Sequence, residues 1–347
     1  MNRLIEQNFQ PSPGFDIAPR SINDASRHRP GHEPANGKPA AAWVRPNQTP
    51  FVALTRLRGV LLLGGSVGTS QFRSSIRRSI IGLPIEDNQT LLTHWREHCG
   101  ELAKTLNQEG LPVRLILDQT AHMPEPVALS HEPIQLSVER DPVEFRGTGG
   151  LLRDLAQGYQ DDDYLLVATA VQLLQIPLPV ITAELANQLA PVVVVSHSDG
   201  TPSGIMLLRC NCLRDLPLVG FVDMKEQGLG IIARRHTVKV LQRAHPTGLP
   251  IRTHISYLSA IRQYHQDRVS TSNCGAPSPK LEDWERAFAI VEEGAVVSPS
   301  AKIHDSVILK GGRVEADAVV VNSVVCDGGV VKRGQVVADE LIKSGGR

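Results

Sequence analysis

The sequence has neither an excess of one charge nor a long apolar stretch, the features that would indicate a charged partner or a membrane. Lys and Arg together number 36, and so do Asp and Glu, so the 347-residue chain has no formal net charge. A balanced chain has no overall field that would attract nucleic acid or an anionic membrane surface. It also lacks any apolar stretch of about 20 residues, the length that spans a bilayer. We therefore expect neither nucleic acid nor a membrane as a partner.

Aromatic residues and cysteines are scarce as well. Aromatic residues make up 4% of the chain, although an apolar fraction of 41% is enough for a core. The five cysteines are Cys99, Cys210, Cys212, Cys274 and Cys326. An odd, scattered set disfavours a disulfide framework, and the Cys-Asn-Cys at 210–212 lacks the second pair of a zinc site. Because the first six residues are not followed by the apolar core of a signal peptide, we expect reduced thiols in the cytoplasm.

Four segments differ in composition. Residues 1–50 are rich in Pro, Asn, Arg, His and Gly, which predicts a disordered arm. Residues 51–265 alternate short apolar runs with amphipathic stretches. Residues 266–292 begin with the polar stretch "QDRVSTSNCGAPSPK", which predicts a linker, and continue into a short helix or extended lead-in. Residues 293–347 form a separate, repetitive segment.

The segment 51–265 has the pattern of an α/β domain. The predicted strands are 59–63, 113–117, 164–168, 192–196 and 204–209. The predicted helices are 91–107, 149–158, 183–189 and 253–265. Strands that alternate with helices favour a mostly parallel sheet covered on both faces.

The tail repeats itself without a gap. "SVILKGGRVEADAVVVN" (306–322) aligns with "SVVCDGGVVKRGQVVAD" (323–339), with identical serines, valines and paired glycines at matching places. An aliphatic residue every five or six positions predicts a triangular parallel β-helix, with a meander of β-hairpins as the alternative. About three coils bury little surface alone. We therefore expect the stack to dock on the α/β domain or on a second copy, which would make the protein a homo-oligomer through the β-helix.

The stretch "LLLGGSVGTSQFRSSIRRSIIGLP" (61–84) has an apolar run that ends in glycines, as in a strand that enters a phosphate-binding loop. A dinucleotide-binding loop would need Gly-x-Gly-x-x-Gly, a following helix and an acid after the second strand. Here the glycines are at 64, 65 and 68, residues 70–79 read as a loop, and no acid is suitably placed. The dinucleotide interpretation is therefore disfavoured.

Together with the β-helical tail, several motifs resemble the sugar-1-phosphate nucleotidyltransferases. These are Leu63-Gly64-Gly65, Gly68-Thr69 and Leu83-Pro84 after the first strand, and "GTGGLLRDL" at 147–155, similar to the family's nucleobase turn. The resemblance implies a Rossmann-like, mostly parallel nucleotidyltransferase domain followed by a short left-handed β-helix. The nucleotide-binding residues it implies are Leu63, Gly64, Gly65, Gly68, Thr69, Gly147, Thr148 and Gly149. The sugar-side candidates are Gly204, Glu139, Asp223 and Lys225.

The family reaction joins two polyanions, so its members need cations and a carboxylate-bound Mg²⁺. At the matching positions this chain has Ser70 in place of the loop Arg and Ile80 in place of the Lys. The strand that should end in a metal-binding Asp ends in Thr-Ala-Val at 169–171, and Pro250 stands in for the second Asp. Three nearby arginines could supply part of the missing charge: Arg73, Arg77 and Arg78.

This pattern leads to the hypothesis of a nucleotidyltransferase fold that has lost ordinary activity, with a nucleotide or sugar phosphate as its expected ligand and no certain cofactor. Mg²⁺ is expected only if the protein is active. One alternative is an active enzyme whose metal ligands are relocated, for example to Asp118 or Asp199. Another is an acyltransferase that uses His304 of the tail. The third is a non-enzymatic scaffold or regulatory subunit.

Overall fold

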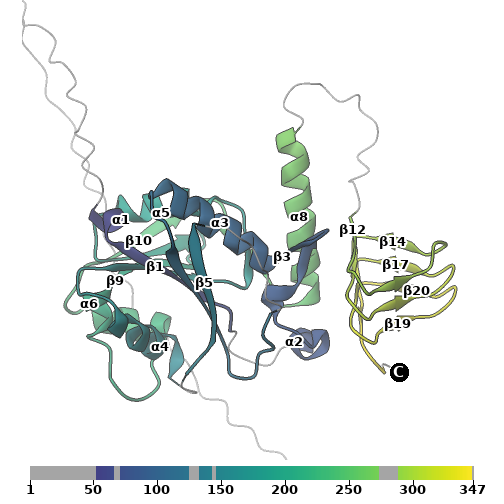
Figure 1. Cartoon of the computed structure of the whole chain (residues 1–347), viewed down its shortest axis with the longest axis horizontal. Helices are drawn as coiled ribbons and strands as arrows, with labels where there is room; N and C mark the ends of the chain where they lie inside the picture. The colour runs from purple at the N-terminus through teal and green to yellow at the C-terminus, as the bar shows by residue number, and fades with distance from the viewer. Residues whose placement is uncertain (1–51, 66–70, 125–132, 143–145, 273–287, 346–347) are drawn as a thin grey trace, which may run out of the picture. The chain divides into compact units, whose positions relative to one another are not determined.

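A computed structural model of the chain describes residues 52–65, 71–124, 133–142, 146–272 and 288–345. The predicted arm, residues 1–50, lies outside these ranges. The described chain has a seven-stranded sheet with helices on both faces, followed by stacked coils of short parallel strands (Figure 1). No described helix combines the length and the apolar character that crossing a membrane requires.

The central sheet has the order β10-β8-β9-β6-β1-β4-β5. Its strands are β1 (Leu57–Leu63), β4 (Leu111–Leu117), β5 (Ile134–Arg140), β6 (Tyr164–Thr169), β8 (Val192–His197), β9 (Pro202–Arg209) and β10 (Val238–Arg243). All run parallel to β1 except β9, which pairs antiparallel with both β6 and β8. Two short antiparallel pairs accompany the sheet. One is the hairpin of β2 (Pro84–Glu86) and β3 (Gln89–Thr90), and the other joins β7 (Gln172–Leu174) to the distant β11 (Gly248–Pro250).

The helices divide between the two faces of the sheet. The first face is covered by α3 (Leu91–Thr105), α5 (Leu178–Ala186) and α8 (His254–Ser272), whose apolar side chains share one core with Leu62 of β1. The opposite face is covered by α4 (Gly147–Leu155), α6 (Cys210–Leu213) and α7 (Leu229–Ile232) around Leu61 (Figure 1). The shorter helical elements are α1 (Val52–Thr55), α2 (Gln71–Ile76), η1 (Ile80–Gly82), η2 (Ala156–Gly158) and the π-helical turn η3 (Met224–Gly228). The predicted mostly parallel sheet covered on both faces is thus confirmed.

The tail is a β-helix with three sheets. The first contains β12 (Ala289–Val291), β15 (Ser306–Ile308), β18 (Val324–Val325) and β21 (Leu341–Ile342). The second contains β13 (Val296–Val297), β16 (Arg313–Val314) and β19 (Val330–Val331), and the third β14 (Lys302–His304), β17 (Val319–Val321) and β20 (Val336–Ala338). All pairs are parallel. The hairpin meander is therefore wrong.

Each coil of the β-helix advances by the period that the repeat predicts. Val307 pairs with Val324, 17 positions on, and the aliphatic residues between the faces form an interior core of their own. Gly311 and Gly328 turn equivalent corners with φ of +81° and +69°, a conformation that glycine adopts without a steric penalty. The identical glycines of the repeat are therefore corner residues.

The β-helix docks on the α/β domain. Ile290, Val307 and Val324 on its first sheet belong to the same apolar cluster as α3 and α8. Two arginines of the α/β domain add polar contacts. Arg78 donates to Glu292 (Nη1 to Oε1, 2.7 Å), and Arg262 donates to Asp305 at 3.0 Å. Of the two arrangements expected from the sequence, docking on the α/β domain is therefore the one seen within a single chain.

Several boundaries differ from the predictions. The helix predicted at 183–189 begins at Leu178, because Pro179 lies in the first turn, where a missing N–H costs nothing. The helix α8 continues to Ser272, into the predicted linker, and β12 starts the coils at Ala289, before the predicted 293. Residues 71–76, predicted as loop, form α2 because Phe72 and Ile76 bury one side of a helix too short to show a period.

Candidate functional site

The candidate site lies where the order of the strands reverses. From β1 the chain moves to β4 and β5, and then returns across β1 to β6 on its other side. In open α/β sheets, ligands bind in the crevice beyond the carboxyl ends of strands at such a switch point. The backbone confirms that the ends meet there. Gly64 N donates to Ile116 O at 2.8 Å, and Ala170 N donates to Leu63 O at 2.9 Å.

The turn after β1 requires glycine. A Cβ on Gly64 would lie 2.7 Å from Leu117 Cδ2 and 2.9 Å from Leu115 Cδ1, which is closer than side chains tolerate. On Gly65 it would lie 3.4 Å from the backbone N of Asp118, an ordinary contact distance. Gly64 therefore lets β1 end in close contact with β4. The predicted Gly68 and Thr69 lie outside the described residues.

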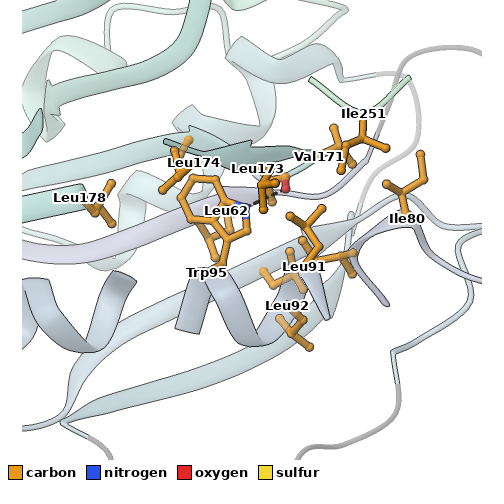
Figure 2. Packing of buried hydrophobic residues seen from close by; sticks show 14 of the residues in the cluster. Leu62, Ile80, Leu91, Leu92, Trp95, Val171, Leu173, Leu174, Leu178 and Ile251 are labelled. Carbon is orange, nitrogen blue, oxygen red and sulfur yellow. Dashed lines mark hydrogen bonds between the residues drawn. The ribbon is translucent and has the colours of Figure 1, made fainter. Parts of the chain in front are cut away.

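A second turn contacts the segment that follows β6. Ile251 N donates to Val171 O at 2.9 Å, and Pro250 pairs with Gln172 between β11 and β7. Trp95, fully buried on α3, donates from its indole N to Ala170 O at 2.8 Å (Figure 2). The structure thus brings together the segments that contain Gly64, Ala170 and Pro250, as the resemblance implies.

These segments do not fit a magnesium ion. Ala170 is fully buried and Pro250 has no ligand atom in its side chain, whereas Mg²⁺ requires oxygen ligands, usually carboxylates. The hydroxyl of Thr169 lies against Gly204, whose φ is +80° and where an added Cβ would come within 2.5 Å of Thr169 Oγ1. Among the described residues, no three His, Cys, Asp or Glu side chains form a group that could hold a metal.

The turn at the start of α4 is built by close backbone contact. Gly147 has φ of +68°, and Gly149 N donates to Val222 O at 2.8 Å. Thr148 Oγ1 accepts a hydrogen bond from Met224 N at 3.0 Å. The turn is thereby fixed to the segment before η3. Lys225 belongs to η3, and its backbone N donates to Asp223 Oδ1 at 2.8 Å.

Asp223, a further sugar-side candidate from the sequence, lies in this region. Its carboxylate caps η3 by accepting from the backbone N of Lys225 and Glu226, and it lies 3.4 Å from Thr148 Oγ1. An acid followed three residues later by Glu226 is the pattern of a helix N-terminus.

We expect Gly147→Ala to distort this turn. The added methyl would lie 2.5 Å from Val222 O, a backbone atom that cannot rotate away, and φ of +68° is unfavourable for alanine. The free energy of unfolding should fall by about 1–3 kcal/mol. Urea denaturation checks this, with Gly158→Ala as the control because nothing lies within 4 Å of its Cβ position. Equal stability of the two variants would contradict the assignment.

The three candidate arginines point to different places. Arg73 on α2 forms an ion pair with Asp118, the residue that follows β4. Arg77, with φ of +50°, lies 4.0 Å from Asp327 of the β-helix, and Arg78 is bound to Glu292. Arg73 is therefore the arginine of the three whose ion pair lies beside the glycine turn.

The remaining candidates lie apart from the glycine turn. Glu139 on β5 accepts two hydrogen bonds from Arg114 (2.9 and 2.6 Å), and these bonds hold the pKa of its carboxyl below the ordinary value. Asp199 lies in the turn between β8 and β9, where Oδ1 accepts from Thr201 N at 2.8 Å. His304 is exposed on β14 of the β-helix.

No protein-family model and no curated protein matches the chain. Among solved structures, it is similar to HddC from Yersinia pseudotuberculosis, with 14% identity, 60% of this chain and 100% of that chain covered, and a TM-score of 0.43. It is also similar to a putative glucose-1-phosphate thymidylyltransferase from Bacillus anthracis in complex with a sucrose, with 12% identity, 59% and 94% coverage, and a TM-score of 0.44. Likenesses this distant leave the function to be argued from the site itself.

Proposed function

We propose that this chain is a nucleotidyltransferase-fold protein, of the kind that resembles sugar-1-phosphate nucleotidyltransferases, and that it binds a nucleotide or sugar phosphate without ordinary turnover. The ligand's phosphates would lie beside Gly65, beyond the carboxyl ends of the parallel strands, where open α/β sheets bind their ligands. The base would lie toward the turn at Gly147.

One observation carries the proposal. The segments that would present metal-binding carboxylates meet at the crevice, but they present Ala170 and Pro250. Sequence positions matching the loop Arg and Lys hold Ser70 and Ile80. Loss of one preorganised charge-stabilising group typically lowers a rate by about 10²–10³. Losing a metal and two cations together would remove the reaction from the range of useful rates.

The test is a pyrophosphorolysis assay with Mg²⁺ and pyrophosphate against a panel of common nucleotide sugars. We expect no detectable nucleoside triphosphate. Binding of the same nucleotides, measured by equilibrium dialysis, should still be seen. Turnover at about 1–10³ s⁻¹, the ordinary enzymatic range, would overturn the loss of activity, and absence of all binding would favour a scaffold.

An active enzyme with relocated ligands is the second candidate, and the position of Asp118 beside Gly65 favours it. A single carboxylate that is already paired with Arg73 is a poor Mg²⁺ site, however. If the wild-type protein turns over and Asp118→Ala abolishes turnover while leaving the fold intact, this second candidate replaces the first.

A further inference from the structure

We propose that Arg73 is the phosphate-binding cation of the crevice and that Asp118 is its built-in competitor, a carboxylate that occupies the guanidinium until a ligand phosphate displaces it. This inference rests on the proposed function, because it names the residues that regulate anion binding at the same site. It concerns this chain in particular, since the cation comes from α2 and not from the glycine loop.

Local packing places Arg73 at the crevice. The neighbouring Phe72 and, one helical turn on, Ile76 are buried, so α2 is held in one rotational setting. Phe72 also contacts the ring of Tyr257 on α8, with centroids 5.9 Å apart. Arg73 itself retains 21% of its side-chain exposure. A guanidinium that is anchored at its base and partly open to solvent can reach an incoming anion.

Asp118 lies where a ligand anion would lie. It follows the last residue of β4, and the Cβ position of Gly65 is 3.4 Å from its backbone N and 3.6 Å from its own Cβ. Thr120 Oγ1 donates to its Oδ1 at 3.0 Å. The carboxylate is therefore held against the glycine turn from one side, while Arg73 binds it from the other.

The balance of charge makes exchange feasible. Partly exposed ion pairs between carboxylate and guanidinium are weak, and a phosphate offers the arginine more negative charge than the carboxylate does. Asp118 would keep its bond from Thr120 after Arg73 has left it. The carboxylate would also repel the arriving anion, so it should lower affinity even when displaced.

The experiment measures binding of inorganic tripolyphosphate by isothermal titration calorimetry without divalent metal. We expect Arg73→Gln to weaken binding about 10- to 100-fold, as loss of a charged hydrogen-bond donor does. Asp118→Asn should tighten binding about 3- to 10-fold, because it removes the competitor and its charge. Arg77→Gln, the matched control, lies 4.0 Å from Asp327 of the β-helix and should change binding less than twofold.

Under the exchange mechanism, Arg73→Gln weakens tripolyphosphate binding and Asp118→Asn strengthens it. If the two residues had only a structural role, both variants would bind more weakly. Thermal melting of Arg73→Gln and Arg73→Lys establishes that a loss is not unfolding. If wild type binds tripolyphosphate and Arg73→Gln equals Arg77→Gln, the assignment of Arg73 fails while the proposed function survives. If Asp118→Asn weakens binding, Asp118 is no competitor. Wild type that binds no phosphate compound at all overturns the proposed function itself.

Discussion

Replacing Trp95 by alanine is expected to lower the free energy of unfolding by about 3–5 kcal/mol, the usual cost of removing a large buried aromatic side chain. Trp95 is fully buried in the core between α3 and the first face of the sheet, among Leu62, Leu91 and Leu173 (Figure 2). Its indole N–H also donates hydrogen bonds to the carbonyl oxygens of Ala170 and Gln172, at 2.8 and 3.2 Å. The Trp95 side chain therefore stabilises both the core and the segment that follows β6.

Equilibrium unfolding in urea measures the effect. Trp95→Phe separates its two parts, since it keeps most of the apolar volume but leaves the carbonyls without their donor, at an expected cost of about 1–3 kcal/mol. Leu189→Ala is the control, because Leu189 is 76% exposed and should change stability by less than about 0.5 kcal/mol. A loss below about 1 kcal/mol in Trp95→Ala would show that the core under the site is packed differently.

Acidification is expected to destabilise the protein through His94. Burial, the charge of His98 and, in the opposite sense, a hydrogen bond to Leu174 O set the pKa of His94 at about 3. Burial also lowers the pKa of His98, although Glu101 partly opposes this. The ring of His94 is packed against His98 and Tyr264, with centroids at 4.6 and 5.8 Å. The folded state therefore holds His94 neutral well below pH 6.5.

The sign follows from proton uptake. Below pH 6.5 the unfolded chain binds a proton at His94 and the folded chain does not, so stability falls by about 1.4 kcal/mol per pH unit for this group. Integrated between pH 6.5 and 4.5, the loss is about 2 kcal/mol, because the unfolded imidazole is only half protonated at pH 6.5. Urea denaturation at several pH values measures the loss. In His94→Gln, which keeps a donor for Leu174 O, the free energy of unfolding should fall less steeply with decreasing pH, by the contribution of one proton taken up on unfolding. An unchanged slope would contradict the assignment.

The parts of the fold that local sequence patterns specify were predictable. The strands β1, β4 and β6 are runs of buried aliphatic residues, and the coils repeat every 17 positions with glycine at the corners. Edge strands were not predicted. β10 has no buried residue, and it includes Lys239 and Gln242, so its composition does not distinguish it from a loop.

The architecture of the crevice was predictable through the resemblance, because the glycine turn, the end of β6 and the closing turn are recognisable motifs. The roles of individual charges were not. Arg78 pairs with Glu292, which is 214 positions away in the sequence, and Arg73 pairs with Asp118, which is 45 positions away. Such pairs depend on how α2 and the β-helix pack, and no local pattern encodes them. The support that Trp95 gives to Ala170 is likewise a contact between distant segments.

The most direct measurement is a crystal structure of the full chain soaked with tripolyphosphate and Mn²⁺, with anomalous scattering used to locate the metal. The account predicts a phosphate beside Gly64 and Gly65 in contact with Arg73, and no manganese bound by carboxylates of the chain at that turn. A manganese ion held there by Asp118 and a second carboxylate would contradict it and would identify a working catalytic metal site.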